Sequence, residues 1–137
     1  MNKTEVLAFL NANPTCHLAT VEGDKPHVRA IGIVKADENG IIIETGTFKD
    51  IYKQLSANPN VELCFNNYQQ GVQIRVSGAV ESVDDLKLKD EIIAQRPFLK
   101  QRVAEGGYEA MGVFRLKGVA YVWTSQTASE PKTYIRL

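Results

Sequence analysis

A cluster of hydroxyl, glycine and lysine residues lies where a predicted strand gives way to a predicted helix. Thr45 and Thr47 supply hydroxyl groups, Gly46 a flexible backbone, and Lys49 an ammonium group where a helix over residues 49–57 begins. The first turn of a helix exposes unpaired N–H groups and the positive end of its dipole, and both attract anions. A lysine in that turn is unfavourable for the dipole, so a bound anion explains its presence. The cluster predicts a phosphate site.

The same residues have a purely structural interpretation, which the sequence leaves open. Thr47 would then be the N-cap of the helix, and Asp50, three residues later, would close a capping box. Lys49 would be a solvated side chain neutralised by the adjacent Asp50. Threonine caps are common at helix N-termini, so the cluster alone does not decide between the two interpretations.

Two polar side chains on predicted strands are further candidates for ligand binding. Arg29 shares one face of a strand over residues 27–36 with isoleucines, where it either binds an anion or packs its stem and extends its guanidinium into water. Gln73 lies on the polar face of a strand over residues 72–81. Its amide both donates and accepts hydrogen bonds, which suits the edge of a planar heterocycle, although a solvent-facing sheet surface is the commoner case.

The remaining reactive residue types form no recognisable catalytic or metal-binding pattern. His17 and His27 are the only histidines, Cys16 and Cys64 are spaced neither as CxxC nor as zinc ligands, and we assign no metal site. Trp123 is more typical of a core or interface than of a cofactor stack. The chain contains no GxSxG, GxxxxGK[ST], GxGxxG or HExxH motif, which argues against hydrolysis of esters or nucleotides.

Composition predicts one ordinary globular domain over residues 1–137. The 16 basic and 16 acidic residues leave no net charge that would attract nucleic acid or an anionic membrane. No apolar run approaches the length of a membrane span, and the N-terminus has no secretory pattern. We therefore expect a cytoplasmic protein with no nucleic-acid or membrane partner and with reduced thiols.

Hydrophobic periodicity predicts short strands with helices placed between them, including a hairpin at Asn39–Gly40, a bulge at Gly78 and a last hairpin at Lys117–Gly118. The first three strands should form an antiparallel meander. These elements predict a mainly β fold, a small antiparallel barrel of six or seven strands with peripheral helices. The predicted strands are 16–21, 27–36, 41–44, 61–65, 72–81, 110–116 and 119–124, and the predicted helices are 2–11, 49–57, 82–95 and 98–103.

Four segments, taken together, resemble the pyridoxamine 5'-phosphate oxidase-like family of FMN-binding split-barrel proteins, in particular its short general-stress-protein-like branch. The resemblance covers most of the chain, from the first helix through Val122. No single segment is diagnostic, but their joint order is specific. The segments are PHVRAI (26–31), IETGTFK (43–49), LSANPNV (55–61) and VQIRVSG (72–78).

The resemblance implies an FMN-binding split barrel that acts as a homodimer, with each flavin site formed by both chains. It implies that Arg29 and Lys49 hold the FMN phosphate, that Thr45 adds a hydroxyl after the third strand, and that Gln73 approaches the flavin. The cofactor contacts it implies are Arg29, Ala30, Ile31, Glu44, Thr45, Thr47, Phe48, Lys49, Gln73 and Trp123.

Departures from the family pattern refine the expected function. Residues 125–132 lack the arginine and histidine motif with which the full oxidases hold pyridoxal, so we do not expect a vitamin B6 oxidase. Val34 and Phe48 replace basic residues, which makes the phosphate clamp leaner. The expected function is an FMN-dependent oxidoreductase that passes electrons from reduced nicotinamide to a small acceptor. The alternatives are a non-catalytic flavin- or haem-binding stress-response module, with His17 or His27 as axial ligand, and a deazaflavin-dependent reductase.

Overall fold

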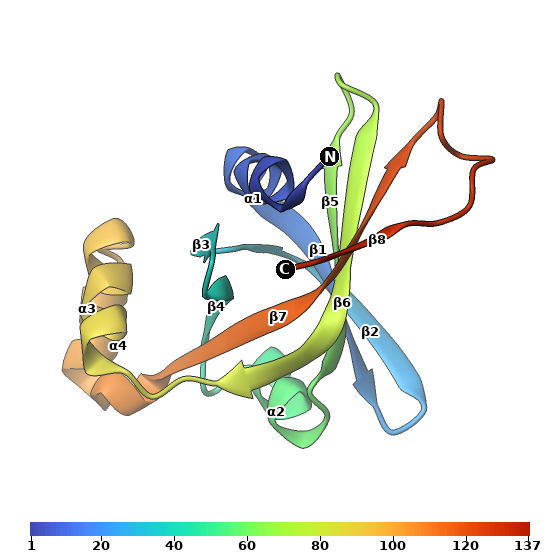
Figure 1. The fold of residues 1–137 in the computed structure, drawn as a ribbon. Helices are drawn as coiled ribbons and strands as arrows, with labels where there is room; N and C mark the ends of the chain where they lie inside the picture. Colours follow the sequence, from blue (N-terminus) through green and yellow to red (C-terminus); the bar gives the residue numbers. More distant parts are fainter.

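The computed structural model describes all 137 residues, which form four α-helices and an eight-stranded antiparallel sheet (Figure 1). The helices are α1 (Lys3–Ala12), α2 (Asp50–Ala57), α3 (Leu86–Gln95) and α4 (Leu99–Gly106), and a short 3₁₀ turn, η1, spans Tyr108–Ala110. The strands are β1 (Thr15–Glu22), β2 (Lys25–Gly32), β3 (Lys35–Asp37), β4 (Gly40–Gly46), β5 (Asn60–Asn67), β6 (Val72–Ser82), β7 (Met111–Thr124) and β8 (Tyr134–Arg136). No helix combines the length and the apolar composition needed to cross a membrane.

The sheet runs in the order β2-β1-β5-β6-β7-β4-β3, with β8 added alongside β7. The prediction of a mainly β, antiparallel fold with peripheral helices is confirmed. The predicted count of six or seven strands is too low, and the strand order does not close the sheet into a complete barrel. Part of the shortfall lies in the C-terminal tail, whose polar sequence gave no strand signal and whose residues Tyr134–Arg136 nevertheless pair with β7.

The predicted long strand over residues 27–36 is wrong, because the chain divides it between two edges of the sheet. Up to Gly32 the chain pairs with β1, and from Lys35 onward it pairs with β4. The change of partner falls at Ile33 and Val34, whose N–H groups bond to Pro14 O (3.0 Å) and Ile42 O (2.8 Å). The two antiparallel pairings of the predicted meander are present as β1–β2 and β3–β4, but they lie at opposite ends of the sheet order, so the three strands do not form one meander.

The predicted hairpin at Lys117–Gly118 is wrong, because β7 runs through this point without a turn. Gly118 lies opposite Gly78 of β6 in an unbroken register. A Cβ on Gly118 would collide with the carbonyl of Ser77, so glycine serves close packing of two backbones here. β7 is the longest strand of the sheet and pairs with β6, β4 and β8 along its 14 residues.

The predicted bulge at Gly78 is likewise wrong. β6 keeps one continuous register with β5 and with β7 through Gly78, so no residue is left unpaired. A Cβ at this position would lie 3.0 Å from Leu116 Cδ1 and 3.1 Å from Gly118 Cα. Gly78 and Gly118 are register partners, so the two long central strands pair at this point with no side chain between their backbones.

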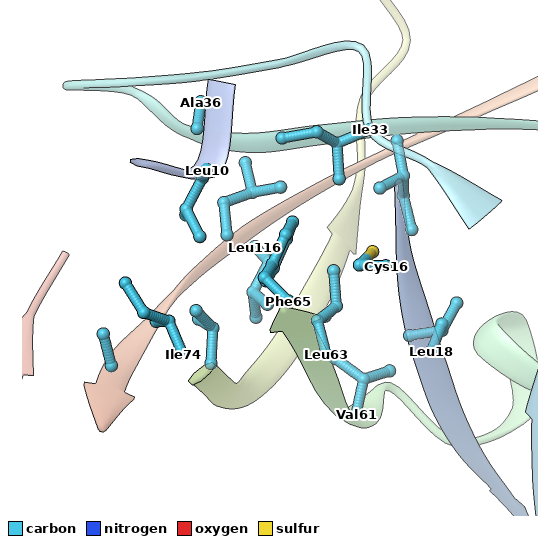
Figure 2. Close-up of a cluster of buried hydrophobic side chains, with 14 of the residues drawn as sticks. Leu10, Cys16, Leu18, Ile33, Ala36, Val61, Leu63, Phe65, Ile74 and Leu116 are labelled. Carbon is cyan, nitrogen blue, oxygen red and sulfur yellow. The ribbon is translucent and has the colours of Figure 1, made fainter. Parts of the chain in front are cut away.

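The main core lies between the inward faces of the strands and the helices α1 and α2. Figure 2 shows side chains from β1, β5, β6 and β7 converging with Leu10 of α1. α1 begins as predicted, with Asn2 Oδ1 accepting a hydrogen bond from Glu5 N (2.9 Å). The labelled core residues with no more than 1% exposure are Leu10, Cys16, Leu18, Leu63, Phe65, Ile74 and Leu116.

A second, smaller core holds α3 and α4 against the end of the sheet where β7 begins (Figure 1). Ile92 of α3 and Leu99 of α4 are fully buried there, against Ile42 of β4 and Val113 of β7. α3 begins at the Asp85 cap, whose side chain accepts from Leu88 N (3.1 Å), rather than at Ser82 as predicted. This packing brings the segment between α3 and α4 beside β2 and β4.

Candidate functional site

The start of α2 lies at the predicted phosphate site but is built differently from the prediction. Lys49, not Thr47, is the N-cap residue, and no side chain caps the helix, so the predicted Thr47–Asp50 capping box is wrong. The N–H groups of Tyr52 and Lys53 both bond to Lys49 O, at 3.1 and 3.4 Å. The N–H groups of the two residues before them have no carbonyl partner and are free to bind an external acceptor.

This uncapped helix start borders a cavity of about 280 Å³ between β2, β4 and the α3–α4 connection. The cavity brings together six of the ten predicted contacts: Arg29, Ala30, Ile31, Glu44, Thr45 and Lys49. It adds six residues that the sequence did not single out: Gly32, Ile43, Ile51, Arg96, Phe98 and Arg102. Four basic side chains and a single carboxylate line the cavity, which gives it a net positive charge.

The carboxylate of Glu44 is almost enclosed and is paired with a basic residue. Arg102 Nη1 donates to Glu44 Oε2 at 2.9 Å, and only 4% of the Glu44 side chain is exposed. Burial raises the pKa of Glu44, while the positive charges of Arg102, Arg96 and Lys49 act in the opposite direction. Because Arg102 compensates this carboxylate, Glu44 does not cancel the charge of the other three basic residues.

Arg96 and Arg102 reach the cavity from helices that the sequence placed far from it. Arg96, the C-cap of α3, donates from Nη2 to Gly32 O (3.0 Å) and Ile33 O (3.1 Å), which ties it to the end of β2. In the sequence, Arg96 lies between the two predicted helices over residues 82–95 and 98–103. No local pattern links it to a site on β2, since the contact depends on how the second core packs.

Arg29 does not extend its guanidinium freely into water, as the structural interpretation of the sequence expected. Within the cavity lining, Nη1 donates to Thr20 Oγ1 (2.8 Å) and to Leu18 O (3.4 Å), and Nη2 donates to Gln54 Oε1. Burial lowers the pKa of Arg29, and the nearby carboxylate of Asp50 raises it in part. Arginine stays protonated at neutral pH in such surroundings, so the group keeps its charge beside the cavity.

Thr47 and Phe48 lie in the turn before α2 but do not line the cavity. Thr47 N donates to Ala110 O at 3.1 Å, which fastens the turn to η1. The ring of Phe48 is largely exposed and lies under the guanidinium of Arg102, 5.7 Å from the ring centroid. Gly46 makes room for this ring, because a Cβ there would meet it.

Gln73 and Trp123 lie in a different place from the other predicted contacts. They are register partners on β6 and β7 and share a separate cavity of about 150 Å³. Gln73 Nε2 donates to Asn66 Oδ1 at 3.0 Å. The two cavities have no lining residue in common, so a single chain does not bring all ten predicted residues together.

The histidines and cysteines lie outside the cavity. His17 is exposed on β1, and His27 Nε2 lies 3.4 Å from Glu22 Oε1. Burial, with a contribution from Cys64, raises the pKa of the Cys16 thiol to about 12, which keeps it protonated and unreactive. No group of three His, Cys, Asp or Glu side chains is placed to hold a metal ion.

The arrangement of the larger cavity suits an anion attached to an apolar body. Lys49 and the free N–H groups at the start of α2 offer donors, and Arg29 adds a further charged group to the lining. Isoleucines 31, 43 and 51 supply the apolar walls, and Thr45, which is 6% exposed, adds a hydroxyl. A phosphate monoester carries the matching charge and acceptor oxygens.

Known proteins of one family resemble this chain in sequence. The sequence profile of the family described as pyridoxamine 5'-phosphate oxidase matches residues 3–123. The pyridoxine/pyridoxamine 5'-phosphate oxidase of Actinobacillus succinogenes is 30% identical over 129 residues, which cover 93% of this chain and 60% of that protein. The chain therefore spans about three fifths of the length of this curated relative.

Solved structures share the arrangement of strands and helices. A NimC/NimA family protein from Clostridium acetobutylicum has a TM-score of 0.79 and 28% identity, with 98% of this chain and 92% of that chain covered. General Stress Protein 26 from Bacillus anthracis has a TM-score of 0.72, with all of both chains covered, and its 17% identity shows a common fold alone. The predicted split-barrel fold is confirmed, and this chain belongs to the pyridoxamine 5'-phosphate oxidase family.

Proposed function

We propose that this protein binds FMN and passes electrons from a reduced nicotinamide to a small acceptor. The observation that carries the proposal is the common cavity of Arg29, Lys49 and the uncapped start of α2. These groups offer positive charge and free N–H donors in a pocket that also has isoleucine walls, as a phosphate monoester with an apolar body requires. Membership of a family whose characterised relatives act on a pyridoxamine phosphate supports a phosphorylated ligand.

The donor set fits the phosphate of FMN and assigns a task to each residue. Lys49 and the first N–H groups of α2 would hold the phosphate oxygens, and Arg29 would face them from β2. Thr45 would donate its hydroxyl to the same end of the ligand. Bound FMN would supply the redox chemistry, and the protein would fix its position and exclude competing reactions.

We further propose that the active form is a homodimer. Gln73 and Trp123 border a separate cavity, so a ligand that contacts them together with Lys49 requires a second chain. The outward face of β1 and β2 supports this proposal, because no helix of the two cores packs on it. Val28 lies on this face with 69% of its surface exposed, opposite Ala19 of β1.

A vitamin B6 phosphate is not the substrate we propose. In residues 125–132, which follow β7, no arginine or histidine is present to hold its phosphate or ring. Lys132 is the single basic residue of this segment, and its ammonium lies 5.4 Å from the centroid of the Tyr121 ring. The acceptor is better described as a small molecule that reaches the flavin through an open site.

Calorimetric titration with FMN and with riboflavin tests the proposal, because the two ligands differ only in the phosphate. We expect FMN to bind at least about 10-fold more tightly, since one charge-assisted hydrogen bond contributes about 1.5–3 kcal/mol. The purified protein should also show flavin absorption after FMN is added. Equal affinity for the two ligands, or binding of neither, would show that the cavity is not an FMN phosphate site.

Two other ligands are distinguished by the same titrations. A haem Soret band, without oxidation of reduced nicotinamide when FMN is present, would favour a non-catalytic haem-binding module. Tighter binding of a deazaflavin cofactor than of FMN would favour a deazaflavin-dependent reductase. Steady oxidation of reduced nicotinamide by the FMN-loaded protein, with a small acceptor present, is the result that the proposal predicts.

A further inference from the structure

A buried polar network lies behind the cavity and ends at Arg29. Thr20 of β1 is fully buried and Gln54 of α2 is 7% exposed, although both carry polar side chains. Thr20 Oγ1 donates to Gln54 Oε1 at 2.6 Å and accepts from Arg29 Nη1 at 2.8 Å. Gln54 Oε1 also accepts from Arg29 Nη2. Each buried oxygen is therefore satisfied through the same guanidinium.

The network engages only part of the guanidinium. An arginine carries five N–H donors, and the bonds to Thr20, Leu18 and Gln54 use both hydrogens of Nη1 and one of Nη2. The Nε–H and the second Nη2–H have no partner among the hydrogen bonds of the protein. These two donors form the fork with which arginine binds a phosphate or a carboxylate.

The chemistry of the acceptors preserves the charge of Arg29. A hydroxyl, an amide and a backbone carbonyl hold the guanidinium, and all three are neutral. A carboxylate in place of Gln54 would hold it equally well but would cancel its positive charge toward a ligand. Gln54 also lies on α2, the helix that begins at Lys49, so the docking of α2 and the orientation of Arg29 depend on the same contact.

We infer that Thr20 and Gln54 are positioning residues, which fix the guanidinium of Arg29 toward the cavity through neutral contacts and so prepare it for an anionic ligand. The inference rests on the proposed FMN site and names two residues that act through Arg29. A purely structural role, in which the network only anchors α2 to β1, makes a different prediction. It would lower stability without changing the preference for FMN over riboflavin.

Thr20→Val and Thr20→Ser form a matched pair for the test. Valine keeps the shape of threonine and removes the hydroxyl, whereas serine keeps the hydroxyl. We expect Thr20→Val to weaken FMN binding about 10-fold, the loss of one hydrogen bond to a charged group, and to leave riboflavin binding unchanged. Thr20→Ser should restore FMN affinity to within about twofold of the parent. An unchanged ratio of FMN to riboflavin affinity in Thr20→Val would overturn the inference.

Gln54→Glu gives a second readout that does not depend on the folding of Thr20→Val. The glutamate keeps an acceptor for Arg29, so the unfolding temperature should not fall, but FMN affinity should fall at least about 10-fold. Parent-like FMN affinity in this variant would contradict the positioning role.

A double-mutant comparison tests whether Thr20 affects FMN binding through Arg29. With Arg29→Ala as the background, Thr20→Val should produce no further loss of FMN affinity, because its effect passes through the guanidinium. Additive losses in the two variants would overturn the inference. If the parent itself binds FMN and riboflavin equally, the proposed function fails and the positioning role fails with it; if the parent prefers FMN and Thr20→Val keeps that preference, only the positioning role fails.

Discussion

Lys49→Ser should change protein stability and FMN affinity in opposite directions. Lys49 is the N-cap of α2, makes no capping hydrogen bond, and places a positive charge at the positive end of the helix dipole. A serine there can accept a bond from the first turn, worth about 0.5–2 kcal/mol, and removing the lysine relieves a further 0.3–1 kcal/mol or so. We expect the ligand-free variant to be about 1–2 kcal/mol more stable, which raises its unfolding temperature by roughly 3 °C or more.

The same substitution removes one of the charged donors proposed for the FMN phosphate. We expect FMN affinity to fall about 5- to 150-fold, equivalent to about 1–3 kcal/mol, while riboflavin affinity stays the same. Thermal unfolding of the ligand-free protein and calorimetric titration with both ligands measure the two effects. Lys53→Ser is the matched control, because Lys53 is exposed on the same helix and does not line the cavity.

A gain in stability together with a loss of FMN affinity would indicate that Lys49 contributes to ligand binding and lowers folding stability. Lys53→Ser should neither stabilise the protein nor change the ratio of the two affinities. If Lys49→Ser leaves FMN affinity unchanged, the ammonium does not contact the phosphate. If it lowers stability, the helix start is not strained by the lysine, and the electrostatic reasoning about α2 is wrong.

Three further predictions concern the dimer, Glu44 and the central strands. Val28→Glu should convert the proposed dimer to a monomer in light scattering, whereas Leu86→Glu, at an exposed site on α3, should not. Glu44→Gln should gain stability relative to the parent as pH rises above 4.5. Burial raises the pKa of Glu44 in the folded protein, so ionisation of this carboxyl group opposes folding. A difference in the free energy of unfolding that stays constant with pH in denaturant titrations would contradict this prediction. Gly118→Ala should destabilise the protein by about 3 kcal/mol, while Gly32→Ala, whose Cβ would make only an ordinary contact with Arg96 Nη2 at 3.8 Å, should change stability little in the same titrations.

The sequence predicted the strands well where side-chain alternation decides burial, and poorly where the choice of neighbour matters. Residues 61–65 and 72–81 alternate clearly, and both lie within observed strands. Residues 27–36 alternate just as well, yet they divide between β2 and β3. Alternation specifies a face and not a pairing partner, so no local pattern could show the change at Ile33.

Glycine gave a second ambiguous signal. Gly40 terminates a hairpin as predicted and has a positive φ of 112°. Gly118 has no positive φ and instead allows the backbones of β6 and β7 to approach closely. A turn and a close approach both require the absence of a side chain, and the sequence alone does not separate them.

The candidate site was predictable in the part that comes from one stretch of chain. Thr45 and Lys49 flank the start of a helix, and that local chemistry led to the phosphate hypothesis. Arg102 enters from a helix more than fifty residues away, and Thr20 and Gln54 became relevant only once β1 and α2 were packed together. The sequence does not identify side chains that contact residues distant in the chain, because tertiary packing determines those contacts.

A crystal structure of the protein with FMN is the most direct test of the central claim. We predict phosphate oxygens about 2.7–3.2 Å from the first N–H groups of α2, from Lys49 Nζ and from the free donors of Arg29. We also predict that the ring lies between two chains, near Gln73 and Trp123 of the partner. A phosphate bound elsewhere, for example in the cavity beside the C-terminal tail, would contradict the account.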